Sequence, residues 1–239
     1  MAGSTANTPV GNGHWHMEIK DFFHGIPEVR ERFLELATRK VYPKNEIIFF
    51  EDDVSPSCFY LEKGIVKIFK ISLSGKEPIF FMRHQGEMFG LAEVTENKRR
   101  KCNAQTLTDC VLHVLPKEKF EELVATSPAF ALMVINILGA RVRYLGDQIE
   151  SLMVCDVSVR LAKLLVYLVF NQLGDPESWE QAVEIEKKLT QEQMAAMTGS
   201  CQQTISETLK AFQAEGLIEV NRRRITLLNP LALLSKAQK

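Results

Sequence analysis

The chain has 239 residues, of which 46% are hydrophobic and 25% are charged, and its formal net charge is -1. This balance is typical of a globular protein and excludes collagen-like, purely coiled-coil and wholly disordered chains. Because the charges almost cancel, a nucleic-acid-binding surface would have to come from local clustering of basic residues.

The N-terminal segment is rich in Gly, Ser, Thr and Asn, and we interpret residues 1–17 as a disordered tail or a remnant of cloning. The segment lacks the apolar core of a signal peptide. No uninterrupted apolar run reaches the roughly 20 residues that a membrane helix needs. We therefore expect a cytoplasmic protein with no membrane partner.

Residues 18–127 are predicted to form a β-rich domain. Short apolar runs alternate with turns that contain glycine, such as Ser74-Gly75, where glycine can adopt the positive φ of a tight hairpin. Closely spaced strands with such turns are typical of an antiparallel sandwich or barrel. The predicted strands are Ile47–Phe50, Cys58–Leu61, Ile65–Ile71, Ile79–Met82 and Val111–Leu115.

A helix is predicted over Lys117–Val124, and a much longer one begins at Ser127-Pro128, because proline is well tolerated in a first helical turn. Apolar residues of the long helix recur at alternating intervals of four and three, as in parallel helices that pack together. We interpret residues 128–155 as a dimerisation helix; the alternative is that the seam packs on the chain's own domain. The seam comprises Ala131, Ile135, Leu138, Val142, Leu145, Ile149 and Leu152.

Asp156 is an acceptable N-cap for the next predicted helix, Val157–Leu173, because its carboxylate can accept hydrogen bonds from free backbone N–H groups. A polar loop is predicted over residues 176–182. We place the domain boundary at Asp156, so that residues 156–239 form a separate domain.

The stretch from Leu189 to Leu228 predicts a helix-turn-helix followed by a winged hairpin. Thr190 and Gln193 have the spacing of a capping box, and Gly199 can take the left-handed conformation that a tight turn needs. Two short helices joined by such a turn are typical of DNA-binding proteins. The rival interpretation is an ordinary helical hairpin with a charged loop.

The second helix of this motif would be the recognition helix. Ser200 and Gln203 repeat the capping-box spacing, and the helix would run to about Ala214. Glutamine can pair with N6 and N7 of adenine, hydroxyl groups can bind phosphate, and Glu207 can accept from N4 of cytosine. The predicted DNA contacts are Thr190, Ser200, Cys201, Gln202, Gln203, Thr204 and Glu207, with Arg222, Arg223 and Arg224 at the tip of the wing.

In this order the parts resemble the CRP/FNR family of transcription regulators, named for the cyclic-AMP receptor protein and the fumarate-nitrate reduction regulator. The resemblance covers nearly the whole chain from about Asp21 and is strongest in LTQEQMAAMTGSCQQTISETLKAFQAEGLI. It implies an α+β fold with a double-stranded β-helix (jelly-roll) sensor domain, a dimerisation helix and a winged helix-turn-helix. It also implies double-stranded DNA, a second copy and RNA polymerase as partners, and no enzymatic activity.

The family's cyclic-nucleotide-binding members hold the ribose with a glutamate and the cyclic phosphate with an Arg-Ser pair. Leu91 and Lys101-Cys102 stand at those positions here. Leucine cannot accept a hydrogen bond, and lysine replaces a bidentate fork with a point charge. The resemblance therefore implies a small anionic effector other than cyclic AMP, or a redox signal. The predicted effector residues are Gly90, Leu91, Arg99, Lys101 and Cys102, with Lys101 singled out for an inward role against the alternative of a solvated loop.

This sequence offers few ligands for the cofactors of other sensors in the family. The FNR-like members carry a group of cysteines near the N-terminus that binds an iron–sulfur cluster. No cysteine precedes Cys58 here, so we expect no such cluster. His84, His113 and Cys102 are eligible haem ligands, but such residues are more often structural, and we expect no haem and no other metal. Cys201 starts the predicted recognition helix, where a thiolate is stabilised. Oxidation there could weaken DNA binding; the alternative is a passive side chain near phosphate.

Gln202, Gln203 and Glu207 stand where the best-known members present Arg, Glu and Arg. The operator is therefore expected to be read more through adenine and less through guanine. Two other classes of function stay open. One is an effector-binding module that acts through protein contacts, and the other is a cupin-type enzyme, which lone His84 and His113 do not favour.

Overall fold

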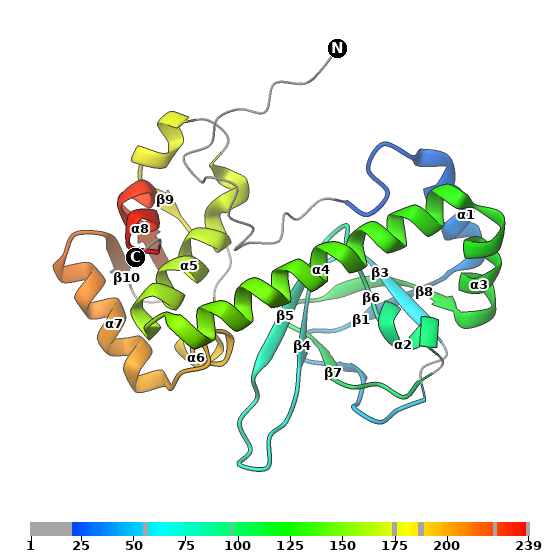
Figure 1. Ribbon diagram of the computed structural model, residues 1–239, viewed down its shortest axis with the longest axis horizontal. Helices are drawn as coiled ribbons and strands as arrows, with labels where there is room; N and C mark the ends of the chain where they lie inside the picture. Colours follow the sequence, from blue (N-terminus) through cyan, green and yellow to red (C-terminus); the bar gives the residue numbers. More distant parts are fainter. Residues whose placement is uncertain are drawn as a thin grey trace. The chain divides into compact units, whose positions relative to one another are not determined.

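A computed structural model describes residues 21–54, 57–96, 98–173, 176–185, 189–221 and 224–237. The chain divides into two compact units, and the division falls inside helix α4, between Val142 and Arg143. The first unit contains the β-roll and the second contains the helix-turn-helix (Figure 1).

Two antiparallel four-stranded sheets form the first unit. Their strand orders are β1-β8-β3-β6 and β2-β7-β4-β5. The strands are β1 (Thr38–Tyr42), β2 (Ile47–Phe49), β3 (Ser57–Lys63), β4 (Ile65–Phe69), β5 (Ile79–His84), β6 (Met88–Phe89), β7 (Asn103–Thr106) and β8 (Cys110–Pro116). This is the predicted jelly roll. The helices are α1 (Pro27–Leu36), α2 (Leu91–Glu96), α3 (Lys117–Thr126) and the first part of α4 (Pro128–Val154).

Strand β3 shows how the side chains are divided between the two faces of its sheet. Phe59 and Leu61 belong to a buried cluster with side chains from both sheets, while Cys58 and Tyr60 belong to another with side chains from α1, α3 and α4. Successive strand residues point to opposite faces, so a strand buried on both sides is apolar throughout. Burial on both faces therefore explains the continuous apolar run from which β3 was predicted.

Three strands of the first unit were missed by the sequence prediction. Residues Thr38–Tyr42 of β1 are mostly exposed, and β7 (Asn103–Thr106) carries polar side chains, so neither has an apolar run. Strand β6 has only two residues. The predicted strands were found, and Gly75 has the expected positive φ of 75° between β4 and β5.

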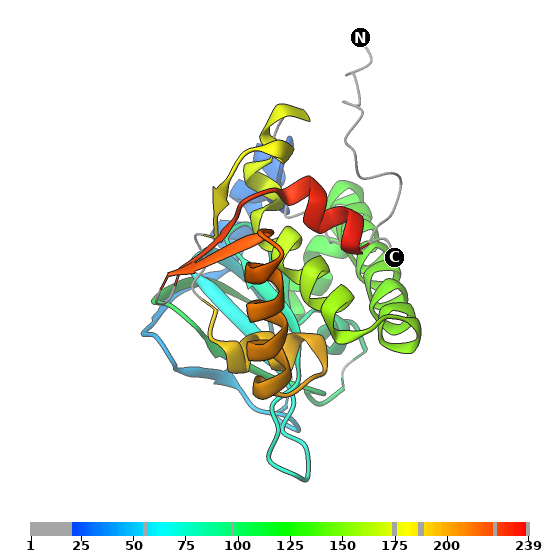
Figure 2. The same ribbon diagram turned by 90° about the vertical axis from the view of Figure 1, so that its left-hand side faces the viewer.

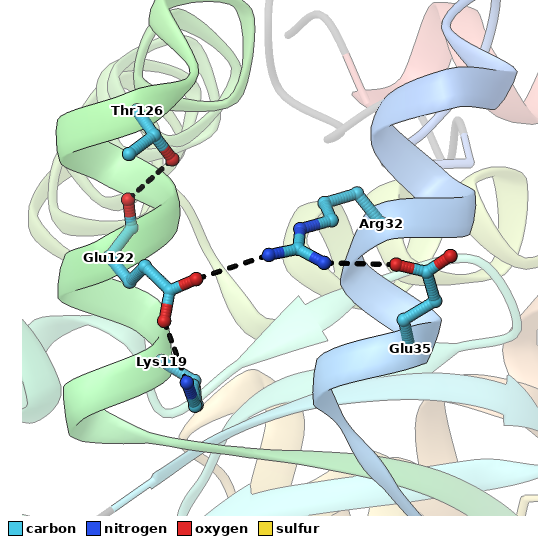
Figure 3. Close-up of polar contacts among 5 residues, drawn as sticks. All are labelled: Arg32, Glu35, Lys119, Glu122 and Thr126. Atoms are coloured by element: carbon cyan, nitrogen blue, oxygen red, sulfur yellow. Dashed lines mark hydrogen bonds and ion pairs between the residues drawn. The ribbon is translucent and has the colours of Figure 1, made fainter.

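Helices α1 and α3 are joined by a surface network of ion pairs (Figure 3). Arg32 lies 3.0 Å from Glu35 on its own helix and 3.2 Å from Glu122 on α3. Glu122 also accepts from Lys119 at 2.7 Å, and its backbone carbonyl accepts from the hydroxyl of Thr126. Exposed pairs of this kind contribute little each, so the aromatic core beneath them holds these helices in place.

Helix α4 exposes most of its apolar seam. Ile135, Val142, Leu145, Ile149 and Leu152 are each at least 40% exposed, whereas Leu138 packs partly against the β-roll core. Among the described helices, α4 alone is long and apolar enough to cross a membrane, judged by length and composition only. Arg141 and Arg143 interrupt its apolar sequence.

The second unit is a helical domain with a small sheet. It contains the end of α4, α5 (Val157–Val169), η1 (Phe170–Gln172), η2 (Pro176–Glu180), β9 (Val183–Glu184), α6 (Gln191–Thr198), α7 (Gln202–Ala214), β10 (Ile218–Asn221), β11 (Arg224–Leu227) and α8 (Pro230–Ala237). The antiparallel sheet has the order β10-β11-β9. In Figure 2, α7 is drawn in orange, the hairpin of β10 and β11 in orange-red and α8 in red.

The predicted polar loop at 176–182 is wrong. Residues Pro176–Glu180 form a 3₁₀ helix, and Trp179 within it is fully buried against Phe170, with ring centroids 5.9 Å apart. The loop was predicted because most residues of this segment are polar. Burial of the one large aromatic side chain nevertheless fixes the segment in the fold. Asp156 precedes α5 as predicted, but within the described residues its side chain makes no capping hydrogen bond.

Candidate nucleic-acid interface and sensor residues

The capping box of α6 is formed as predicted. The Thr190 hydroxyl accepts from the backbone N–H of Gln193 at 3.1 Å, and the Gln193 side chain accepts from the backbone N–H of Thr190 at 2.9 Å. Two N–H groups that lack partners inside the helix are thereby satisfied. Thr190 therefore has a structural role at the start of α6.

Gly199 forms the turn between α6 and α7, with φ of 62°. A Cβ atom at this position would also lie 3.1 Å from Cδ2 of Leu152, near the end of α4. Both the left-handed backbone and the close approach favour glycine. The turn of the motif is thus packed against the helix that carries the apolar seam.

Helix α7 begins one residue later than the sequence predicts. Cys201 is its N-cap, and the predicted capping box between Ser200 and Gln203 is not formed. Because Gln203 is then the second residue of the helix, its side chain does not reach back to the cap. It instead donates a hydrogen bond to Glu207, one turn further along, at 3.1 Å.

One face of α7 fixes the helix and the other is open to solvent. Ile205, Leu209 and Phe212 are buried at the helical spacing of four and three. The start of the opposite face is exposed at Cys201, Gln202, Gln203 and Glu207, and Thr204 and Ser206 are half-buried. The polar residues predicted to contact DNA therefore lie on the accessible side of a firmly packed helix.

The wing is an antiparallel hairpin in which Asn221 of β10 pairs with Arg224 of β11. Arg222 and Arg223 lie outside the described residues. Arg224 is exposed, and its guanidinium lies 3.6 Å from the carboxylate of Glu184 on β9. It belongs to β11, beside a carboxylate, rather than to the tip of the wing.

Cys201 has an exposed thiol. Its Sγ lies 3.1 Å from the hydroxyl of Thr204. Hydrogen bonds to the sulfur, first from the Thr204 side chain and then from nearby backbone groups, lower the pKa of this thiol. The sequence expectation of a favoured thiolate thus has a local cause, the hydroxyl one turn away.

In the β-roll, Arg100 takes the inward position that we predicted for Lys101, which is exposed. The Arg100 guanidinium donates to the carbonyls of Ser57 at 2.5 Å and Gly90 at 3.3 Å, and it lies 3.5 Å from the carboxylate of Glu93. It also lies over the ring of Phe49, at 4.1 Å. The prediction for Lys101 is wrong because the contacts with Ser57, Gly90 and Phe49 are made by Arg100 instead.

The other predicted effector residues do not gather at one point. Leu91 is buried as part of the core, and Arg99 extends outward to bond the carbonyl of Asp52 at 2.7 Å. Cys102 is half-buried, and burial, with a smaller effect of Glu93, raises the pKa of its thiol to about 11. Gly90 adjoins Arg100 so closely that an added Cβ would lie 2.7 Å from Nη1.

A second group of buried charges was missed by the sequence prediction. Arg83 and Glu87 form an ion pair of 3.1 Å at the β5–β6 turn, and both are at least 96% buried. Arg141 of α4 is also buried and donates to the carbonyl of Met88. Burial, together with the nearby Arg83, lowers the pKa of Arg141. The Glu87 carboxylate thus pairs with Arg83 and, from further away, partly offsets the lowered pKa of Arg141.

The candidate haem ligands are separate. His113 bonds the carboxylate of Glu62 at 2.6 Å, and His84 is buried in β5. Among the described residues no group of three or more His, Cys, Asp and Glu could hold a metal ion.

Comparison with known families agrees with this architecture. Residues 39–127 match the family described as "Cyclic nucleotide-binding domain", and residues 159–235 match the "Crp-like helix-turn-helix domain". The chain belongs to the CRP/FNR family. It is therefore a member of a family of DNA-binding transcription regulators, which are not enzymes.

Individual CRP/FNR relatives are distant but span most of the chain. The "Cyclic AMP receptor protein" of Thermus thermophilus is 25% identical over 205 residues, which cover 85% of this chain and 90% of the relative. The "Global nitrogen regulator" of Synechococcus elongatus is 27% identical, covering 84% and 93%. A CooA mutant from Carboxydothermus hydrogenoformans shares the fold, with a TM-score of 0.75 at 22% identity over 94% of this chain and 99% of that chain.

The parts of this CRP/FNR protein differ in how clearly the sequence predicted them. The helix-turn-helix was visible because its capping box, turn and buried face are local. Arg83 stands in an apolar strand and Glu87 in a Gly-Glu-Met-Phe-Gly turn. A charged residue inside an apolar strand was the one available sign of this buried group.

Proposed function

We propose that two copies of this regulator join along α4 and present a pair of α7 helices to one operator. Successive major grooves on one face of DNA are about 34 Å apart, which suits a pair of recognition helices. The observation that carries the proposal is α7. Its apolar face is anchored by Ile205, Leu209 and Phe212, and its polar start is left for base edges and phosphates.

The exposed stripe of α4 supports a dimer. Solvent-facing isoleucine, leucine and valine at heptad spacing stabilise a pair of helices when the stripe is covered. Arg141 and Arg143 lie within the same helix, which makes a membrane span unfavourable. A transcription regulator acts where the chromosome lies, so we propose a cytoplasmic location and RNA polymerase as a further partner.

We propose that signals reach the DNA-binding unit through α4. Arg141 on this helix donates a hydrogen bond to Met88, next to the buried Glu87. A ligand that shifts β6 would change this contact and so bias the position of α4. The ligand is a small anion other than cyclic AMP, because Leu91 stands where the family's cyclic-nucleotide-binding members hold the ribose with a glutamate, and leucine cannot accept a hydrogen bond.

A redox signal is the second candidate for gating, and the exposed thiol of Cys201 favours it. Oxidation of this sulfur would place a larger, more polar group at the start of the recognition helix. DNA affinity measured before and after mild peroxide, with Cys201→Ser alongside, tests this. Equal loss of affinity in the two proteins would exclude Cys201 as the sensor.

Binding-site selection from random DNA, repeated at several salt concentrations, tests the central proposal. We expect a two-fold symmetric site, and affinity that falls steeply as salt rises because phosphate contacts release counterions. Light scattering during gel filtration gives the oligomeric state. A monomer that selects no sequence at low salt would contradict the proposal. A monomer that binds another protein and not DNA would favour the alternative function, an effector-binding module that acts through protein contacts.

A further inference from the structure

Gln203 and Glu207 form a hydrogen-bonded pair on the exposed start of α7. The two residues are four apart, so their side chains lie one above the other on the helix surface. Nε2 of Gln203 lies 3.1 Å from Oε1 of Glu207. An ionised carboxylate can only accept hydrogen bonds, so the amide nitrogen faces Glu207 and the amide oxygen faces away from it.

We propose that Glu207 acts as a positioning residue that makes Gln203 an adenine reader. The proposal rests on the DNA-binding function proposed above and goes beyond it, because it assigns the two residues different tasks. Gln203 touches the base, and Glu207 fixes which end of the amide is presented. This replaces the expectation that Glu207 itself accepts from N4 of cytosine.

The preference for adenine follows from the hydrogen-bonding groups that remain free on the Gln203 amide. A glutamine amide has two N–H donors and an acceptor oxygen, and without an anchor it can turn either end toward a base. With one N–H held by Glu207, the amide presents one donor and one acceptor. Adenine offers the complement in the major groove, with N7 as acceptor and N6–H as donor.

Guanine fits this anchored amide poorly. Its major-groove edge carries two acceptors, O6 and N7. One of them would face the amide oxygen, and the carboxylate behind it would add to the repulsion. The pair therefore favours adenine both by matching it and by rejecting guanine.

Gln202 provides a matched comparison on the same helix. It is also an exposed glutamine, one residue earlier. In the described part of the chain its amide has no carboxylate partner like that of Gln203. We therefore expect Gln202 to contact DNA with less discrimination between bases, and its substitution separates general loss of contact from loss of orientation.

The test uses the full-length protein and the operator that binding-site selection yields. The base that Gln203 reads is located as the position where Gln203→Ala loses its preference. At that position wild-type protein is expected to prefer adenine to guanine by about 10- to 100-fold. In Glu207→Ala the preference is expected to fall below about fivefold. Affinity for random DNA at low salt is expected to rise rather than fall, because the substitution removes a negative charge that faces the phosphates.

A base analogue sharpens the result. Replacing the adenine with 7-deazaadenine removes the N7 acceptor and keeps N6. The wild type should then lose roughly tenfold in affinity and Glu207→Ala less than threefold, with Gln202→Ala behaving as the wild type at this position. An undiminished adenine preference in Glu207→Ala would overturn the proposal. The loss of a preference for cytosine in this variant would also overturn it, because Glu207 would then contact a base directly.

Failure of the proposed function looks different. If the wild type binds no DNA pool, both proposals fall together. If it binds DNA specifically and Glu207→Ala keeps its discrimination, only the positioning role is wrong.

Discussion

The two units of the protein differ in whether they bury charged side chains. The β-roll buries Arg83, Glu87, Arg100 and Arg141, whereas the buried polar groups of the described second unit, Ser151 and Thr198, are uncharged. In the second unit the polar chemistry lies on the surface of α7. A buried charge depends on a partner that is difficult to replace, and an exposed charge is partnered by water. The β-roll should therefore be fragile where the recognition helix is tolerant.

The largest expected effect comes from removing the buried carboxylate of Glu87. Glu87→Ala leaves Arg83 without its ion-pair partner and takes a negative charge away from the vicinity of Arg141, and it should cost about 3–5 kcal/mol of unfolding free energy. Urea denaturation measures this. The control is Glu207→Ala on the surface of α7, which should stay within about 0.5 kcal/mol of the wild type. A cost below about 1 kcal/mol for Glu87→Ala would show that water already serves these arginines.

Cys201, at the start of α7, and Cys102, in the β-roll, should differ in reactivity. Thiolate forms as pH rises through the pKa. The lowered pKa of Cys201 makes its alkylation accelerate below the pH typical of free cysteine, whereas that of Cys102 should rise only toward pH 11. At neutral pH we expect Cys201 to react more than tenfold faster. Iodoacetamide labelling followed by peptide mass spectrometry measures both rates, and faster labelling of Cys102 would contradict the comparison.

A smaller effect is expected from two glycines in the second unit. Gly199→Ala forces a left-handed backbone on alanine and brings its Cβ within 3.1 Å of Leu152, so it should cost about 1 kcal/mol. Gly146→Ala in α4 has open space and helical geometry, and should instead stabilise by about 0.5–1 kcal/mol. Thermal unfolding of the two variants should shift in opposite directions. Shifts of the same sign would mean that the turn is not held as described.

The smallest effect concerns the capping box of α6. Thr190→Ala removes one of its two hydrogen bonds and should cost about 0.5–1 kcal/mol. Thr190→Ser keeps the hydroxyl and should cost much less. Chemical denaturation of this pair separates capping from any role of Thr190 on DNA. Loss of DNA affinity in Thr190→Ala without loss of stability would point to a direct contact.

Sequence patterns located the recognition helix well and the sensor residues poorly, for a physical reason. The capping box, the turn at Gly199 and the buried stripe of α7 each depend on residues a few positions apart. The choice between Arg100 and Lys101 depends on contacts of Arg100 with Ser57 and Phe49, which lie about 40 to 50 residues earlier in the chain. No local pattern records these contacts, nor the contact between Arg141 and Met88.

Some local signals were also ambiguous. Ser200 and Gln203 have the capping-box spacing, yet Cys201 is the N-cap and Gln203 bonds Glu207 instead. Both outcomes fit the same letters, since glutamine can bond backward to a cap or forward to a carboxylate. The exposed strand β1 gave no signal at all, because an edge with polar side chains has no apolar period.

The buried indole of Trp179 offers a way to watch one unit alone. The sequence has two tryptophans, and the other is Trp15, so the stretch from residue 21 to Val142 contains none. With Trp15→Phe in place, tryptophan fluorescence would come from the second unit only, and a red shift would report entry of water around Phe170 and its neighbours. Circular dichroism reports both units, so a transition seen by circular dichroism without a change in tryptophan fluorescence would belong to the first unit.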